Sequence, residues 1–252
     1  FLEKYDKPKV DTIAITNGPG LEPCLWQGVN FAKALAFWWN LPLIPINHIK
    51  AHLAANFINS KPNFPAIGLV ASGGHTELIY MPKIGQYKLI GSTKDDAAGE
   101  CFDKTARILD LPYPGGPSLA LQAKLKMKNE KLKVELPRPM LHSKDFDFSF
   151  SGLKTAVLYN FQSQKKSIRE SQDYKTAMAK EIQQSIIDVL IDKTLKASKQ
   201  FNAKSIITGG GVMANKELRR QFKIKNLKFK ILFFVPEKKL CLDNAAMVGA
   251  SA

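Results

Sequence analysis

Short apolar segments alternate with helix-forming segments in the first part of this chain, and this order constrains the fold more than any other feature. Residues 11–16 read as a strand that ends in a turn, 27–39 as an apolar helix and 43–46 as a second strand. Another helix begins at His48 or directly after it. A β-α-β-α order favours a parallel or mixed sheet, so we expect an α/β fold. The 252 residues suffice for one large domain or two lobes.

The remainder of the chain continues this alternation and adds an antiparallel part. We expect strands at 67–71, 76–80, 87–90, 205–208 and 230–234, and helices at 97–109, at 171–201 and from Asp243 onward. The strands at 76–80 and 87–90 should be antiparallel neighbours, because only short turns precede them. Residues 127–147 are polar and rich in Lys and Pro, so we expect them to be irregular.

Two of the four histidines, His48 and His52, stand four residues apart in a segment expected to be helical. Side chains at i and i+4 lie on one face of a helix, so both imidazoles can bind one divalent metal. Asp243, far downstream, can complete such a site, and the three sets of ligating atoms should then lie within about 5 Å of one another. Two helical histidines also serve as capping or packing groups. No glutamate stands between them, so the zinc-protease motif is absent.

Three glycine-rich turns lie between the histidine pair and Asp243, at 72–75, 114–117 and 209–211. Glycines after a strand let backbone N–H groups approach an anion closely. An ordinary tight turn explains residues 72–75 equally well. Three consecutive glycines after a buried strand favour a backbone pressed against a planar or phosphorylated ligand. Metal ligands together with such turns point to a phosphate-bearing or nucleotide-like substrate.

Residues 95–104 combine acidic groups and a lysine at helical spacing. Asp96, Glu100, Asp103 and Lys104 would follow one side of a helix in steps of three or four residues. Asp103 can hold ribose hydroxyls, as carboxylates do in nucleotide sites. The residues by themselves favour the alternative, which is an acidic helix start with an exposed face.

The chain is strongly basic, with a formal net charge of +15. Such an excess favours a polyanionic partner, because phosphate contacts release counterions. Much of the excess is Lys at 124–133, 164–169 and 222–239, which read mostly as solvated faces. Charge alone therefore leaves nucleic-acid binding open.

The cysteines and the apolar stretches exclude several classes of protein. Cys24, Cys101 and Cys241 are far apart and form no CxxC motif, which excludes a disulfide framework or a Cys-based zinc site; we expect all three to be small buried residues. The most apolar stretch, 34–46, is interrupted by Asn40 and two prolines and is too short to span a bilayer. No signal-peptide pattern precedes the first strand, so we expect a cytoplasmic protein without membrane contact.

In combination, these motifs resemble the tRNA threonylcarbamoyladenosine transferase family (TsaD), once described as O-sialoglycoprotein endopeptidases. The matching segments follow the family's order over nearly the whole chain: NGPGL at 17–21, HIKAH at 48–52, SGGHT at 72–76, residues 95–104, YPGGP at 113–117, FSGLKT at 150–155, GGGVMAN at 209–215 and DNAA at 243–246. Each segment is modestly specific, and the ordered set is very specific. The FSFSGLKT form resembles bacterial or organellar members.

The resemblance implies an actin-like fold with two lobes around a cleft, as in sugar kinases and Hsp70. One lobe would comprise 1–65 and 240–252, and the other 66–239. The family's N-terminal segment, which lines the cleft, does not occur in this sequence. We therefore expect the first lobe to be incomplete, the last helix to be cut short and a possible catalytic carboxylate to be missing, and we assign no catalytic residue.

The resemblance also implies the ligands of the site. One divalent metal per subunit, iron rather than zinc, would be bound by His48, His52 and Asp243. Threonylcarbamoyl-adenylate would lie against Val70, Ala71, Ser72, Gly73 and Gly74. Its ribose would meet Asp103 and Gly116, and Asn215 would contact the nucleotide.

By the same resemblance, the protein would transfer a threonylcarbamoyl group from threonylcarbamoyl-adenylate to N6 of the adenosine 3′ of the anticodon, in tRNAs that read ANN codons, and release AMP. Its partners would be tRNA, a paralogous actin-like protein (TsaB) and a P-loop ATPase (TsaE). Alternatives are an actin-like ATPase or sugar kinase, a metallopeptidase, and an inactive binding fragment. The histidine pair disfavours the kinase, because Mg²⁺ prefers oxygen ligands.

Overall fold

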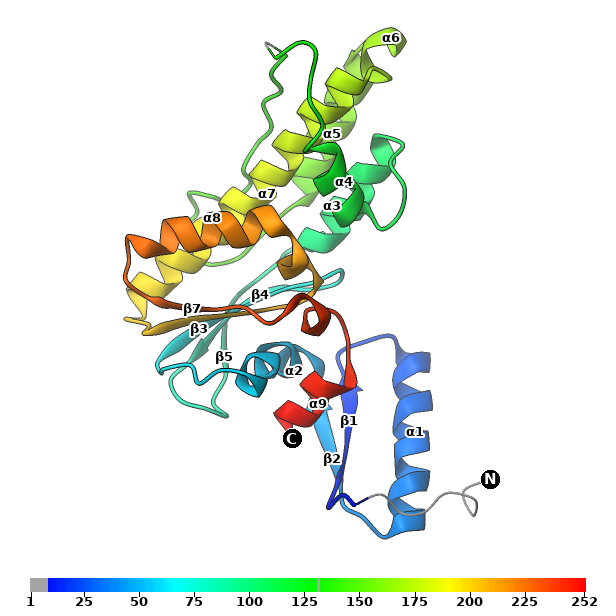
Figure 1. Cartoon of the computed structure of the whole chain (residues 1–252), viewed down its shortest axis with the longest axis vertical. Coiled ribbons are helices and arrows are strands. Elements are labelled where there is room, and N and C mark those ends of the chain that lie inside the picture. Colours follow the sequence, from blue (N-terminus) through cyan, green and yellow to red (C-terminus); the bar gives the residue numbers. More distant parts are fainter. Residues whose placement is uncertain (1–8, 131) are drawn as a thin grey trace.

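The computed structural model describes residues 9–130 and 132–252, whose strands form two separate sheets (Figure 1). The larger sheet has the order β5-β4-β3-β6-β7. Its strands are β3 (Ala66–Ala71), β4 (Thr76–Met81), β5 (Lys88–Ser92), β6 (Ser205–Gly209) and β7 (Leu232–Phe234). β4 is antiparallel to both β3 and β5, whereas β6 is parallel to both β3 and β7. The predicted α/β fold with a mixed sheet is therefore confirmed.

The smaller sheet is a parallel pair, β1 (Ile13–Gly18) and β2 (Leu43–Asn47), connected by α1 (Glu22–Trp39). After β2 the chain enters α2 (His48–Ala54) and a short 3-10 helix, η2 (Ala55–Ile58). The last helix, α9 (Ala245–Ser251), packs on α2. Because α2 contacts strands of both sheets, it joins the two parts of the molecule at the place where the histidines lie.

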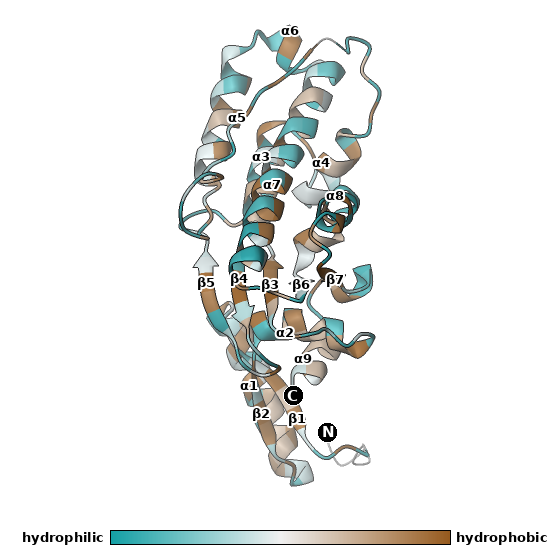
Figure 2. Ribbon diagram, turned by 90° about the vertical axis from the view of Figure 1, so that its left-hand side faces the viewer, coloured by the Kyte–Doolittle hydropathy of each residue, from teal (hydrophilic) through white to brown (hydrophobic). Residues whose placement is uncertain are grey.

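Helices cover the larger sheet and extend beyond it (Figure 2). The longest is α7 (Gln172–Gln200), whose apolar side packs against β3 and β6 and carries many residues of the main core. Around it lie α3 (Ala98–Ile108), α4 (Gly115–Gln122), α5 (Ser151–Ser163), α6 (Lys166–Arg169) and α8 (Lys216–Leu227). Two further 3-10 turns, η3 (Gly211–Ala214) and η4 (Lys238–Leu240), precede and follow α8 and β7.

The two sheets differ in how well they are covered. β3 is buried at every position, and the core above it is continuous. α1, in contrast, buries only Ala32 and leaves large apolar side chains in solvent. Trp26, Phe31 and Phe37 are all exposed, and Phe37 is 88% exposed.

Most of the elements expected from the sequence are present, with shifted ends. α1 begins five residues before the predicted 27–39 helix, because Pro23 occupies the first turn, where its missing N–H costs nothing. Four helices were not predicted: α4, α5, α6 and α8. Most of 127–147 is irregular, as expected. Asp243 does not open the last helix; Asn244 is its N-cap and accepts a hydrogen bond from the Met247 backbone N–H.

Two other predictions have different outcomes. Cys101 and Cys241 are buried as expected, but Cys24 is exposed on α1, so the prediction for that residue was wrong. The division into lobes at 1–65 with 240–252 and at 66–239 stays a prediction, and residues 1–8 lie outside the described part. Among the described helices, none has the length and apolarity needed to cross a membrane.

Candidate functional site

His48, His52 and Asp243 converge on one point although Asp243 is far away in the sequence. Asn47 caps α2, because its side-chain oxygen accepts hydrogen bonds from the backbone N–H groups of the next turn. This cap fixes the start of the helix that carries both imidazoles. Asp243 Oδ1 lies 3.4 Å from His48 Nε2 and 3.3 Å from His52 Nε2. One ligand atom of each residue lies within 4.8 Å of the others, which meets the predicted spacing.

The electrostatics of His52 suit a metal ligand. Its side chain is 1% exposed, and neither ring nitrogen forms a hydrogen bond with any described residue. Burial, with the adjacent His48 imidazole adding to it, lowers the pKa of His52 to about 4 despite the opposing charge of Asp243. The ring is therefore neutral near pH 7 and its nitrogen lone pairs are available. Two imidazoles and a carboxylate form a donor set that fits Fe²⁺ or Zn²⁺ better than Mg²⁺.

A cavity of about 790 Å³ opens between the helices and the ends of the larger sheet. Of the residues predicted to bind the nucleotide, Gly73, Asp103, Gly116 and Asn215 line this cavity. They come from the β3–β4 turn, α3, α4 and the start of α8, so the structure brings four separate segments together.

The strand residues Val70 and Ala71 lie in the interior of the larger sheet, and their predicted contact with the donor stays a prediction. Both are fully buried in β3, where their side chains belong to the core. Ser72 is half-buried, and its carbonyl accepts a hydrogen bond from the Gly99 backbone N–H at 3.1 Å. Only the far end of the 70–74 segment, at Gly73, reaches the cavity.

Asp103 is held in place by the glycine turn that starts α4. Its Oδ1 accepts a hydrogen bond from the Gly115 backbone N–H at 2.8 Å. A Cβ on Gly115 would lie 2.5 Å from Asp103 Cα, so only glycine lets α3 and α4 approach this closely. Three members of the predicted stripe of charges do lie together, because Lys104 pairs with Asp96 and with Glu100 at 2.7 Å each. Asp103 bonds to the Gly115 backbone instead.

Contacts between protein segments explain two residues of the triple glycine. A Cβ on Gly209 would lie 2.5 Å from the His52 carbonyl oxygen, and a Cβ on Gly210 would collide with the Ala71 carbonyl. Gly210 also has a φ of +92°, which L side chains rarely adopt. The first two glycines thus serve contacts between protein segments. Only Gly211 lines the cavity.

Asn215 is fixed by two sets of hydrogen bonds. Its side-chain oxygen caps α8 by accepting from the N–H groups of Glu217 and Leu218 at 2.9 and 3.1 Å. Its side-chain nitrogen donates to Gln183 on α7 at 2.8 Å. The amide is therefore rigid, and a ligand in the cavity meets a preorganised edge.

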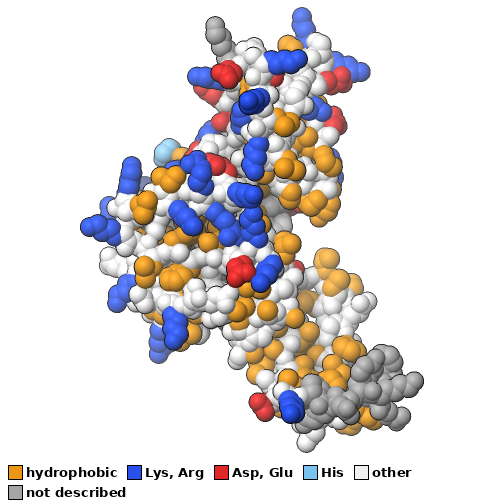
Figure 3. Space-filling view, viewed as in Figure 1, with side chains coloured by type: hydrophobic (Ala, Val, Ile, Leu, Met, Phe, Trp, Pro, Cys, Tyr) orange, Lys and Arg blue, Asp and Glu red, His pale blue; other side chains and the backbone are white. Residues whose placement is uncertain are grey.

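Four lysines on the cavity wall were not singled out by sequence reasoning. They are Lys124, Lys180, Lys216 and Lys238, and they come from four different segments. No ion pair of the described residues involves them. In Figure 3, Lys and Arg side chains gather over α8 and beside the hollow of the surface. Two of the four lie in stretches that read as solvated lysine faces, and only the fold shows that they share a cavity.

The metal-ligand trio and the cavity are neighbours along one segment. Leu242 lines the cavity, and the next residue, Asp243, reaches the histidines. Gly209, at the cavity turn, packs on His52. The two features therefore form one composite site.

Comparison with known proteins identifies the relatives of this chain. The model of the family "TsaD: tRNA N6-adenosine threonylcarbamoyltransferase" matches residues 3–250. The protein of that name from Shouchella clausii is 46% identical over 99% of this chain and 74% of its own length. The protein of that name from Geobacillus thermodenitrificans is 46% identical over 96% of this chain and 69% of its own length.

Solved structures show the fold. The crystal structure of T. kodakarensis HypF matches with a TM-score of 0.66 at 16% identity, over 95% of this chain and 39% of HypF. A full-length HypF in a phosphate- and nucleotide-bound form also matches at 0.66, with 14% identity, over 96% of this chain and 46% of that protein. At such identities the likeness concerns the fold alone, and that fold is actin-like, as the resemblance implies.

Proposed function

The chain belongs to the tRNA N6-adenosine threonylcarbamoyltransferase family, and we propose that it transfers a threonylcarbamoyl group to N6 of an adenosine in tRNA. The donor would be threonylcarbamoyl-adenylate, and the acceptor the adenosine 3′ of the anticodon in tRNAs that read ANN codons. The enzyme is thus an acyltransferase that releases AMP.

The observation that carries the proposal is the composite site. A cavity large enough for a nucleotide has a carboxylate, Asp103, beside a glycine turn, and this combination suits a ribose. The ligand trio lies directly behind its wall, one residue beyond Leu242. A metallopeptidase would need a glutamate base between the histidines, and this sequence has none there.

We include one divalent metal per chain in the proposal, held by His48, His52 and Asp243. Two imidazoles and one carboxylate are the ligand set of many non-haem Fe²⁺ sites and also of catalytic Zn²⁺ sites, and the family resemblance favours iron. The unpartnered nitrogens of buried His52 support it, because a buried polar atom without a partner is costly. When bound, the metal would act as a Lewis acid on a donor oxygen.

The chain's own residues would position the donor. Asp103 would accept hydrogen bonds from the ribose hydroxyls, and Asn215 would meet the nucleotide from the opposite wall. In the transfer, the N6 amine forms a bond to the carbamoyl carbon, the bond from that carbon to the phosphate oxygen breaks, AMP leaves, and the amine loses a proton. Most of the rate enhancement would come from holding the two reactants in this geometry.

The lysines on the cavity wall support a polyanionic acceptor. Lys124, Lys180, Lys216 and Lys238 line the cavity, and none of them forms an ion pair within 4 Å with a carboxylate of the described residues, although Lys124 acts electrostatically on Glu217. Glu217, also on the wall, is paired with Arg220 at 2.6 Å. The positive charge at the opening would attract the phosphate backbone of a tRNA and hold it there.

We also propose a cytoplasmic location and, by family resemblance, assembly with a paralogous actin-like protein (TsaB) and a P-loop ATPase (TsaE). Pull-down from a lysate with tagged wild-type chain and mass spectrometry would test both partners.

The transfer is tested by incubating the chain with an unmodified tRNA transcript and threonylcarbamoyl-adenylate, with and without the two partners. We expect AMP release in step with threonylcarbamoyladenosine, measured by nucleoside mass spectrometry. His52→Ala should lower both, while His142→Ala, a change at an exposed histidine outside the site, should not. Casein cleavage lost in His52→Ala would instead support a peptidase, and rapid ATP hydrolysis without tRNA would support the kinase-like alternative.

A further inference from the structure

Cys241, Leu242 and Asp243 are consecutive residues that reach three different parts of the protein. The Cys241 side chain is fully buried, and its sulfur accepts a hydrogen bond from Arg219. Leu242 lines the cavity, and its Cδ2 lies 3.2 Å from the position that a Cβ would take on Gly211. Asp243 meets the histidines. Any shift of this segment therefore moves a cavity wall and a metal ligand together.

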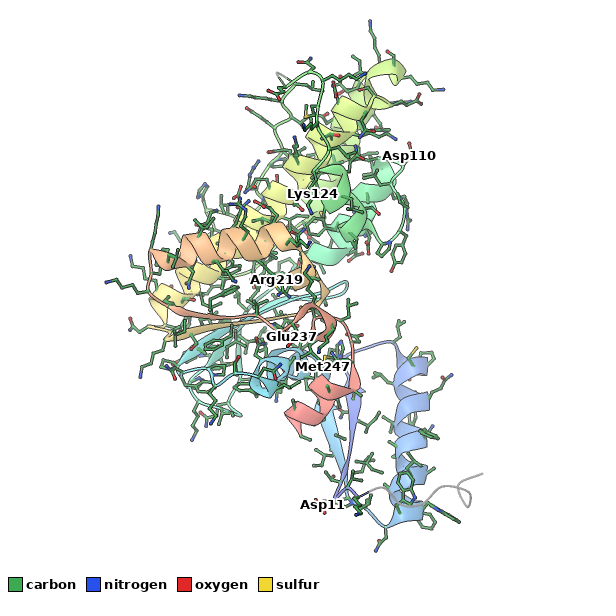
Figure 4. All side chains as sticks on the ribbon, in the orientation of Figure 1. Asp11, Asp110, Lys124, Arg219, Glu237 and Met247 are labelled. Atoms are coloured by element: carbon green, nitrogen blue, oxygen red, sulfur yellow. The ribbon has the colours of Figure 1, made fainter. Side chains whose placement is uncertain are left out.

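Arg219, at the start of α8, holds this segment against the cavity turn. Its Nε donates to the Met213 carbonyl at 2.5 Å. Its Nη2 donates to the Pro236 carbonyl at 2.8 Å and to Cys241 Sγ at 2.9 Å. Figure 4 shows Arg219 at the place where α8 meets the segment that contains Glu237. The planar guanidinium has donors in fixed directions, so it fixes its three acceptors relative to one another.

The other side of Asp243 is held by the cap of α9. The Asn244 side chain donates to the Leu242 carbonyl at 2.7 Å and accepts from the Met247 N–H at 2.9 Å. The Asp243 side chain itself is 76% exposed. Besides its contacts with the two imidazoles, the position of this mostly exposed carboxylate depends on the backbone held by Arg219 and Asn244.

We propose that Arg219 is a positioning residue that couples the metal site to the nucleotide cavity. The inference rests on the proposed function, which supplies the identity of the two ligands. Arg219 does not line the cavity and is not one of the three ligands, so it acts through others. A metal that draws Asp243 toward the histidines also fixes Leu242 against Gly211. Arg219 keeps residues 241–243 at a constant position relative to the turn at 211–214, because it bonds to Cys241 and to Met213. By linkage, metal and nucleotide then raise each other's affinity by the same factor.

The test measures binding alone, with Co²⁺ and AMP as probes in calorimetric titrations of the wild-type chain and variants. In the wild type we expect Co²⁺ to tighten AMP binding by about fivefold or more. In Arg219→Lys, which keeps the charge but not the fork of donors, this factor should fall toward one, and Co²⁺ binding should weaken by about tenfold. Lys223→Met, an exposed change one turn later on α8, is the matched control and should behave as wild type.

A further variant separates coupling from ligation. Leu242→Ala should keep the Co²⁺ affinity of the wild type and lose its effect on AMP, because the ligand stays while the wall contact is removed. Thermal melting checks that each variant is folded. Because a lysine at 219 can still donate hydrogen bonds to the acceptors of Arg219, Arg219→Met, which has no donor, is measured as well.

The inference is overturned if the Arg219→Lys and Arg219→Met variants are both folded and both retain the wild-type coupling. It is also overturned if Co²⁺ does not change the AMP affinity of the wild type, or if the wild type binds neither probe. A chain that performs the transfer but binds the two probes independently refutes the coupling alone. A chain that shows the coupling but performs no transfer refutes the proposed function instead.

Discussion

The proposed metal-ligand trio of His48, His52 and Asp243 and the proposed nucleotide cavity lie side by side, yet they are built in opposite ways. The trio consists of side chains: two imidazoles from one helical face and a carboxylate from the other end of the chain. Part of the cavity wall consists of places where a side chain is missing. Gly73, Gly99, Gly116 and Gly211 all lie on its wall.

This difference shows where each half of the site is vulnerable. A ligand set fails when an atom is removed, because nothing nearby replaces a nitrogen or oxygen donor. A glycine on the wall fails when an atom is added, because the added methyl group either takes space from the ligand, as at Gly73, or meets neighbouring backbone, as at Gly99. Truncation should therefore be most damaging at the trio, and glycine-to-alanine changes should be most informative at the cavity.

The largest effect is expected at the trio. His52→Ala removes the buried ligand and should weaken Co²⁺ binding by about a hundredfold or more, since even outer partners of metal ligands contribute ten- to a hundredfold. Metal titration of the purified chain measures this. His142→Ala should bind as wild type does; equal affinities for both variants would show that the metal lies elsewhere.

Two glycines, Gly73 on the cavity wall and Gly210 next to the wall residue Gly211, should respond differently to the same added methyl group. Gly210→Ala places a Cβ on the Ala71 carbonyl at a φ of +92° and should cost about 2–3 kcal/mol of unfolding free energy. Gly73→Ala meets no atom within 4 Å, so it should leave stability unchanged and weaken AMP binding, because Gly73 faces the cavity. Urea unfolding and AMP titration separate the two, and a stable Gly210→Ala would contradict the packing argument.

Asp103 is the side chain on which the cavity should depend most. Asp103→Ala should weaken AMP binding by about tenfold, because two charge-assisted hydrogen bonds to a ribose would be lost. Asp110→Ala, at an exposed carboxylate just beyond α3, is the control. If 2′,3′-dideoxy-AMP binds to wild type as tightly as AMP does, Asp103 does not hold the ribose.

The sequence predicted the metal-ligand trio better than it predicted the cavity, for a physical reason. The i, i+4 spacing of His48 and His52 is a local rule of helix geometry, so their shared face was predictable. The approach of Asp243 to the two histidines was also predicted, and the structure places the ligand atoms at the expected spacing. The four lysines around the cavity needed the fold, because they come from distant segments. The glycine turns were located correctly. The close approach of Gly209 to the His52 carbonyl and of Gly210 to the Ala71 carbonyl was not predicted, because a sequence does not show which backbone segments are neighbours.

Two of the helices that were not predicted, α8 and α4, also depend on contacts that the sequence does not show. α8 is rich in Lys and Arg and buries only a few residues, so its apolar pattern is weak. α4 begins with two glycines and a proline, which read as a turn, although Pro117 lies in the first turn of the helix, where it is tolerated. In both, tertiary contacts decide the structure more than local propensity does.

The smallest effects are expected at the lysines, because each contributes one charge to a surface that many charges share. Lys124→Gln and Lys216→Gln should each weaken tRNA binding by about threefold at moderate salt and lower the slope of log affinity against log salt by about one, as the loss of one phosphate contact predicts. AMP affinity should stay as in wild type, which separates tRNA contacts from donor contacts. Lys88→Gln, at an exposed position on β5 outside the cavity lining, is the control. If the cavity lysines and Lys88 change the salt slope equally, tRNA responds to net charge rather than to the opening of the cavity. If AMP binding falls instead, these lysines hold the donor phosphate, and the acceptor lies on another face.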